Sequence, residues 1–150
     1  MTIIETIDIN AEPQRVFDAY VNHIDSWWTR RGTYRYSFAP DTTEPRHIRF
    51  DARQHGRFYE EFSDGSQYTI GRIIEFDPPG FLQYTWKAPD WPVETTITVR
   101  FSEVVGGRTS VEVTHEGFGM EGIPDVGDGY AVGLREILGG LKAWIQDHTS

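Results

Sequence analysis

The chain has 150 residues, no cysteine and a formal charge of −9 at neutral pH. This length suits a single domain, residues 1–150, and the lack of cysteine excludes disulfides, thiolate zinc sites and a cysteine nucleophile, as is typical of a cytoplasmic protein. The negative charge argues against nucleic acid or an anionic membrane as a partner, because binding phosphates requires clustered Lys and Arg.

The N-terminal part predicts a strand followed by two short helices. Residues Thr2 to Asn10 alternate between apolar and polar side chains, as a strand does. Asn10 suits the N-cap of the first helix, and Pro13 suits its first turn. A second helical turn is expected from Ile24 to Trp28. The segment Tyr34 to Pro45 has no recognisable pattern, and nothing in the chain approaches the roughly 18 apolar residues of a membrane span.

From Arg46 onward the apolar side chains recur every second residue, which predicts a series of strands. Short turns rich in Asp, Gly and Pro separate them, so neighbouring strands are expected to be antiparallel, because parallel neighbours need long crossovers. One-sided alternation indicates that one face of the sheet is covered. The expected strands are His47–Arg53, Arg57–Ser63, Gln67–Phe76, Phe81–Lys87, Glu94–Glu103 and Arg108–Glu116.

A long C-terminal helix is expected to provide the cover. Apolar side chains recur at helical spacing from Tyr130 to Ile145, over about four turns. Asp125 or Asp128 is the expected N-cap. Gly139-Gly140 inside this helix either allows close packing on the sheet or leaves room above it for a ligand.

Several stretches, in one order along the chain, are similar to a known family. They are Ala11–Ala19 with Trp27-Trp28, Gly56-Arg57-Phe58 with Asp64-Gly65, Gly71–Pro79 with Leu82–Trp86, and Val99–Phe118. These stretches resemble bacterial proteins related to the C-terminal domain of the Hsp90 ATPase activator, in the START-like or helix-grip superfamily. The resemblance implies an α+β fold of the START or Bet v 1 type, in which a curved antiparallel sheet wraps a long C-terminal helix. It also implies a cavity between the two, in members that range from carriers and sensors to a few enzymes.

The candidate site follows from the alternation of the strands. His115 shares a face with Val111 and Val113, so its ring should point under the helix, where it is either satisfied by a neighbour or orients a ligand. Tyr84 and Trp86 share a face and are either core or cavity wall. One of the two tryptophans at 27 and 28 is expected in the core and the other at the entrance. The candidate ligand-binding residues are Trp28, Tyr84, Trp86, His115, Phe118, Tyr130, Leu134 and Leu138.

Catalytic and metal-binding patterns have little support. Glu60 and Glu61 are adjacent on a strand, so their carboxylates should point to opposite faces. The five histidines lack the spacing of a metal site. The run Gly117–Gly122 matches GxGxxG, but no βαβ unit surrounds it, so it predicts a loop that could cover the cavity mouth. No catalytic residue, metal or cofactor is assigned.

The sequence therefore favours a cofactor-free domain that binds a small hydrophobic ligand as a carrier, sensor or sequestration protein, and it leaves a homodimer open. One alternative is an enzyme of the cyclase, hydrolase or isomerase type, which a dyad of His115 with a carboxylate would favour. The other is a protein-interaction module of the Hsp90-activator kind, which an apolar patch on the outer face of the sheet would favour.

Overall fold

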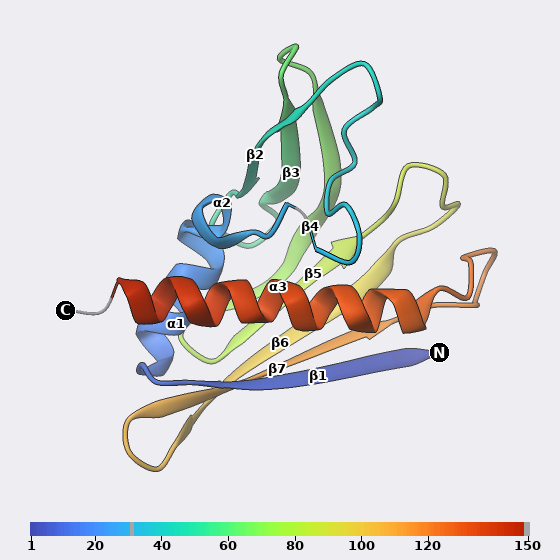
Figure 1. The fold of residues 1–150 in the computed structure, drawn as a ribbon. Coiled ribbons are helices and arrows are strands. Elements are labelled where there is room, and N and C mark those ends of the chain that lie inside the picture. The colour runs from blue at the N-terminus through green and yellow to red at the C-terminus, as the bar shows by residue number, and fades with distance from the viewer. Residues whose placement is uncertain (31, 149–150) are drawn as a thin grey trace.

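A curved antiparallel sheet with one long helix across its concave face makes up the fold (Figure 1). The computed structural model describes residues 1–30 and 32–148. The strand order is β1-β7-β6-β5-β4-β3-β2, so strands β2 to β7 form a meander and β1 pairs with β7. This confirms the helix-grip fold expected from the sequence. The strands are β1 (Thr2–Ile9), β2 (Pro45–Phe50), β3 (Arg57–Phe62), β4 (Gln67–Asp77), β5 (Phe81–Trp86), β6 (Thr95–Val104) and β7 (Arg108–Glu116).

The helices lie where they were predicted, but both predicted N-caps were wrong. Glu12 rather than Asn10 caps the first helix, because a bend between Ile9 and the helix separates Asn10 from it. Val126 precedes the long helix, and Asp128 lies within its first turn, where its charge favours the helix dipole. Within the described residues, no helix is long and apolar enough to span a membrane. The helices are α1 (Pro13–Asn22), α2 (Ile24–Trp27) and α3 (Gly127–Asp147).

Strand β2 ends three residues before its predicted end, at Phe50 rather than Arg53. The chain turns tightly there, and a Cβ atom on Gly56 would lie 2.0 Å from the carbonyl oxygen of Asp51. His55 in the same turn has a φ of 68°, in the left-handed region. Backbone crowding, which no alternation of side chains reveals, therefore ends the strand early.

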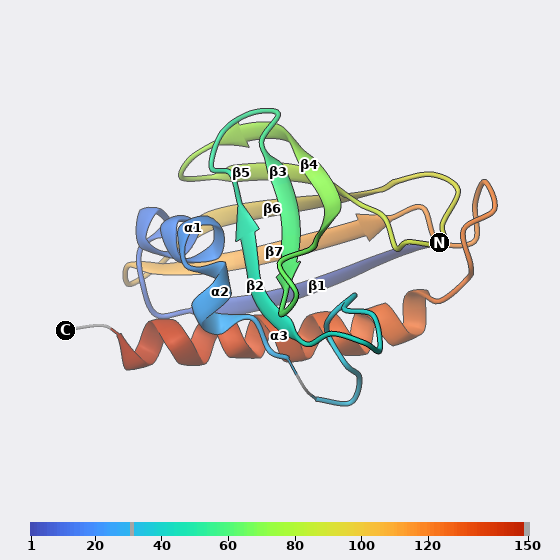
Figure 2. The ribbon, with the colours of Figure 1, turned by 90° about the horizontal axis from the view of Figure 1, so that it is seen from above.

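The core lies between the concave face of the sheet and the helices. Along β6 and β7 the apolar side chains face inward, and the register pairs Val99 with Val113 and Phe101 with Val111. A second, smaller apolar cluster contains Trp91 and Phe118. Figure 2 shows that the sheet curves, so that β2 and β3 cross the direction of β6 and β7. This curvature leaves the concave face hollow beneath α3.

Gly140 allows α3 to approach the end of α2 closely. A Cβ atom there would meet Thr29 Oγ1 at 2.7 Å and the carbonyl oxygen of Trp27 at 2.8 Å, whereas one on Gly139 would meet no atom within 4 Å. Gly140 is closely packed, but the expectation that this pair packs on the sheet was wrong. Its partner is the segment after α2 rather than the sheet, and neither glycine lines the cavity.

Candidate ligand-binding site

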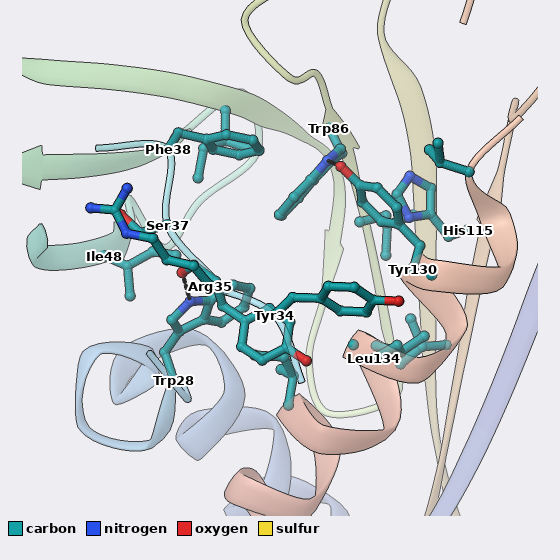
Figure 3. Close-up of a pocket in the computed structure, with 18 of the residues that line it drawn as sticks. Trp28, Tyr34, Arg35, Ser37, Phe38, Ile48, Trp86, His115, Tyr130 and Leu134 are labelled. Atoms are coloured by element: carbon teal, nitrogen blue, oxygen red, sulfur yellow. Dashed lines mark hydrogen bonds between the residues drawn. The ribbon is translucent and has the colours of Figure 1, made fainter. Parts of the chain in front are cut away.

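A cavity of ≈ 510 Å³ lies between the concave face of the sheet and the N-terminal half of α3 (Figure 3). Its wall consists mainly of aromatic and aliphatic side chains from the sheet, from α3 and from the segment 34–38. Small-molecule sites in proteins typically enclose about 300–1,000 Å³ and have this mainly apolar character. The space is therefore large enough for a ligand of several rings.

Most of the residues proposed from the sequence line this cavity. Phe118 and Leu138 do not: Phe118 is fully buried behind the wall, against His115 and Tyr130, and Leu138 lies in the main core. Leu138 lies in the C-terminal half of α3, which is the half nearer to α1 and α2 (Figure 1). The residues of the predicted set that line the cavity are Trp28, Tyr84, Trp86, His115, Tyr130 and Leu134.

One of the two adjacent tryptophans lies in the core, as the sequence predicts. Trp27 is 4% exposed and its Nε1 donates to the carbonyl oxygen of Ala19 at 2.7 Å. Trp28 lines the cavity, and its Nε1 donates to the carbonyl oxygen of Tyr36 at 2.9 Å. Trp28 therefore holds the segment 34–38 in place as well as forming part of the wall.

The segment 34–38 forms a wall that the sequence did not predict. The hydroxyl of Tyr36 donates a hydrogen bond to the carboxylate of Glu136 on α3. The same carboxylate accepts a hydrogen bond from the backbone N–H of Thr33 at 2.9 Å. Burial, the hydrogen bond to Glu136 and the negative charge of Glu136 together raise the pKa of Tyr36 to about 12. The same hydrogen bonds lower the pKa of Glu136. The aromatic residues at positions 34, 36 and 38 were the signal available in the sequence.

Glu60 anchors the other side of this segment to the sheet. It is 1% exposed, and its carboxylate accepts hydrogen bonds from the Ser37 hydroxyl and, at 2.8 Å, from the backbone N–H of Phe38. Arg30 Nη1 lies 3.9 Å from the same carboxylate and is, among the described residues, the one solvent-inaccessible side-chain nitrogen or oxygen without a hydrogen bond. Glu61, next along β3, points to the other face, which confirms the prediction for this pair.

Two tyrosine hydroxyls meet at the cavity wall. Tyr20 from α1 and Tyr84 from β5 are both buried, and their hydroxyl oxygens lie 2.8 Å apart. Burial raises the pKa of Tyr20 to about 12, although the hydrogen bond with Tyr84 opposes the shift. Burial and the neighbouring Tyr20 raise the pKa of Tyr84 well above its ordinary value. One hydroxyl donates to the other, so one hydroxyl proton of the pair has no acceptor in the described part of the chain.

His115 has one nitrogen satisfied and one available. The Thr95 hydroxyl donates its proton to the carbonyl oxygen of Trp86 at 2.7 Å, so at its 2.7 Å contact with His115 it accepts from Nε2–H. This assigns the tautomer in which Nδ1 carries a lone pair. Nδ1 has no hydrogen-bond partner among residues 1–30 and 32–148, and His115 lines the cavity at 4% exposure. The contact with Thr95 confirms that a neighbour satisfies the ring at Nε2, and a role of Nδ1 in orienting a ligand stays a prediction.

The stability of the protein is expected to depend on the protonation of His115. Burial lowers the pKa of this ring from 6.5 to about 3, so between these values only the unfolded chain binds the proton. Stability therefore rises with pH across this window and is lost on acidification, by up to ~1.4 kcal/mol per pH unit.

Chemical denaturation at about pH 7 and about pH 5 checks this, with His115→Leu as the control. The acid-induced loss should be smaller by about 2 kcal/mol in the variant. Long-range ¹H–¹⁵N spectra should show Nδ1 unprotonated throughout. A ring that gains a proton near its ordinary pKa in the folded protein contradicts the assignment.

Other arrangements considered from the sequence do not form a site. His115 contacts Thr95 rather than a carboxylate among the described residues. Within the same residues, no group of three His, Cys, Asp or Glu side chains could hold a metal ion. The glycine motif 117–122 forms turns rather than opening a helix, as expected of a loop, and the connection lines the cavity only beyond it, at Asp125 and Val126.

Solved structures with this fold are numerous. Protein MLL2253 of Mesorhizobium loti has a TM-score of 0.72 at 17% identity, with 100% of this chain and 99% of that chain covered. Protein CV1439 of Chromobacterium violaceum has a TM-score of 0.66 at 22% identity, with 96% of each chain covered. The anthrahydroquino-gamma-pyrone synthase Txn09 has a TM-score of 0.61 at 23% identity, with 93% and 96% covered. At these identities the similarity shows the fold alone.

The family match comes from the sequence itself. No curated protein matches the chain at a significant level. Residues 10–146 match the model of the family described as activator of Hsp90 ATPase homolog 1-like protein. This stretch includes all helices and strands from α1 onward, except for the last residue of α3. Since this match covers nearly the whole chain and the fold agrees with it, the protein belongs to the family of activator of Hsp90 ATPase homolog 1-like proteins.

Proposed function

We propose that the chain binds a small, uncharged apolar or amphipathic molecule in this cavity and acts as a carrier, sensor or sequestration protein. The observation that carries the proposal is the cavity of ≈ 510 Å³ with its mainly aromatic and aliphatic wall. Binding apolar ligands is general in this fold family. A few polar groups, among them His115 and the pair of Tyr20 and Tyr84, provide orientation, as is usual in small-molecule sites.

The charges of the wall favour an uncharged ligand. Glu60, Asp125 and Asp128 line the cavity, whereas Arg35 is the one Lys or Arg among the described lining residues. The guanidinium of Arg35 already donates to the carbonyl oxygen of Ala39 at 2.9 Å. Three carboxylates and one guanidinium leave the wall with an excess of negative charge. A buried carboxylate on the ligand would add to this excess, so an anion such as a fatty acid is disfavoured.

An enzyme that uses the same cavity is the second candidate, and the similarity to the synthase Txn09 is the observation that favours it. General-base catalysis needs a group that takes up a proton near neutral pH. His115 has a pKa lowered by burial and no carboxylate partner in the described part of the chain. Tyr20 and Tyr84 have raised pKa values, so neither ionises readily. These groups suit binding better than proton transfer.

A protein-interaction module has less support. The outward positions of β6 and β7 carry polar and charged side chains rather than an apolar patch. These positions include Thr96, Thr98, Arg100, Ser102, Arg108, Ser110, Glu112, Thr114 and Glu116.

Shortening the cavity wall should weaken the binding of a neutral probe. Leu134 lines the cavity, and Leu141 on the same helix is fully buried outside it. We expect Leu134→Ala to weaken the binding of N-phenyl-1-naphthylamine by about tenfold, because a few methylene contacts worth ~0.8 kcal/mol each are lost. Fluorescence titration measures this.

Leu141→Ala is the matched control, because it should lower stability and leave the dissociation constant unchanged. Mass spectrometry of small molecules released from the denatured, freshly purified protein then identifies a natural occupant. Failure of the wild type to bind the probe, with no molecule released, rejects the proposed function.

A further inference from the structure

The cavity has hydrogen-bonding capacity that the protein does not use, and it lies at two separate places. Nδ1 of His115 is an acceptor without a partner among the described residues. The pair of Tyr20 and Tyr84 holds one hydroxyl proton without an acceptor in that part of the chain. Tyr130 accepts from Trp86 Nε1 at 3.2 Å, so its own hydroxyl proton is also uncommitted there. Buried polar groups left unpaired are costly, so these atoms indicate what a ligand must offer.

The register of the sheet places the two ends apart. Tyr84 pairs with Ile97, and Ile97 pairs with His115, so the three side chains form one row across β5, β6 and β7. Adjacent strands lie about 4.8 Å apart, so the backbones of Tyr84 and His115 are separated by roughly 10 Å. Ile97 between them lines the cavity and is apolar. A ligand that meets both ends must therefore have an apolar body between its polar groups.

The rings of the wall favour a flat ligand. Trp86 lies beside Tyr130 and His115 (Figure 3). The ring of Trp28 lies 6.4 Å from that of Trp86, measured between centroids, and is inclined to it by 29°. Phe38 lies 5.4 Å from Trp86, measured between ring centroids. Aromatic walls contact a flat aromatic ring over a large area and through favourable edge and face geometries.

We propose that the occupant is an uncharged, planar aromatic molecule that carries a hydroxyl on one ring and a carbonyl on another. The hydroxyl of the ligand donates to Nδ1 of His115, and its oxygen accepts the uncommitted hydroxyl proton of Tyr130. The carbonyl accepts the free proton of the Tyr20–Tyr84 pair. Thr95 is a positioning residue, because its hydroxyl accepts from Nε2–H and so leaves Nδ1 as the acceptor. This inference rests on the proposed function.

A matched set of ligands tests the two ends separately. The probes are 2-hydroxyanthraquinone, its methyl ether 2-methoxyanthraquinone, and 2-hydroxyanthracene, which lacks the carbonyls. Quenching of tryptophan fluorescence, below the pKa of the ligand's hydroxyl, gives the dissociation constants. We expect 2-hydroxyanthraquinone to bind at least about tenfold more tightly than either of the other two, because each of them leaves one buried protein group unpaired.

Variants assign each preference to its residues. His115→Leu should remove the preference for the hydroxyl over the methyl ether and retain that for the carbonyl. Thr95→Val, which is nearly the same size, releases Nε2 and lets the ring donate from Nδ1, so the preference should vanish or reverse. The double variant Tyr20→Phe/Tyr84→Phe should remove only the preference for the carbonyl. Tyr68→Phe, outside the cavity wall, should change neither preference.

The outcomes separate this inference from the proposed function. Equal affinity for all three anthracene derivatives, or a hydroxyl preference that survives both His115→Leu and Thr95→Val, overturns the ligand class while the binding function stands. Failure to bind these probes and N-phenyl-1-naphthylamine alike overturns both. Thermal unfolding of each variant shows which of them are folded. If His115→Leu does not fold, Thr95→Val alone tests the contact at Nδ1.

Discussion

Gly71→Ala is expected to destabilise the protein by about 3 kcal/mol or more, or to prevent folding altogether. A Cβ atom at this position on β4 would lie 1.8 Å from the carbonyl oxygen of Thr85 on β5 and 2.4 Å from its carbonyl carbon. Both of these contacts are to backbone, so the strands would have to move apart. The register between β3 and β4 also shifts beside Gly71, between Phe58 and Tyr59, and such bulges bend a sheet. The variant should therefore disturb the curvature that forms the cavity.

Gly139→Ala is the matched control for this substitution. A Cβ atom there meets nothing within 4 Å and lies in the middle of α3, so alanine should stabilise the protein by about 0.5–1 kcal/mol. Urea denaturation of the two variants measures both effects. A Gly71→Ala protein with a denaturation midpoint equal to that of the wild type would show that the strands are not packed as closely as described.

Glu60→Leu is expected to lower the free energy of unfolding by about 3 kcal/mol and to open the cavity. The substitution removes the charged acceptor of Ser37 and of the Phe38 N–H, and it takes away the carboxylate near Arg30. Hydrogen bonds to charged groups contribute about 1.5–3 kcal/mol each, and the donors left behind are partly buried. Because these contacts hold the segment 34–38, the affinity for N-phenyl-1-naphthylamine should fall in parallel.

Two conservative variants distinguish the buried carboxylate of Glu60 from that of its partly exposed neighbour Glu61. Glu60→Gln keeps an acceptor oxygen in place and should cost less than Glu60→Leu. Glu61→Gln, on the other face of β3, should change stability by no more than about 0.5 kcal/mol. Equal effects of the two glutamine substitutions on stability and on probe binding would show that Glu60 does not anchor the wall.

The fold could be predicted because its signals are local. The alternation of β6 and β7 and the apolar stripe of α3 depend on which side chains face the core, and that is set by the period of each element. Helix caps and the end of β2 could not be predicted in this way. They depend on backbone geometry, such as the bend before Glu12 and the crowded turn at Gly56.

The part of the cavity wall formed by regular elements could be located in the same way. His115 and Trp86 lie on the covered face, as their place in the alternation indicates, and Leu134 faces them from α3. Leu138 has the same helical spacing but lies in the main core, whereas its neighbour Ile137 lines the cavity. Periodicity identifies the buried face of an element and not what stands opposite it.

By itself, the sequence determined the antiparallel meander, the covering helix and the absence of any thiol chemistry, because these depend on composition and on spacings of a few residues. Only the tertiary structure decided that Glu60 anchors the segment 34–38, that Tyr20 meets Tyr84, and that Thr95 leaves Nδ1 of His115 free as an acceptor. Each of these contacts joins residues 20 or more positions apart in the sequence. Hydrogen bonds depend on distances of a few tenths of an ångström, and only the packing of the whole chain determines those distances.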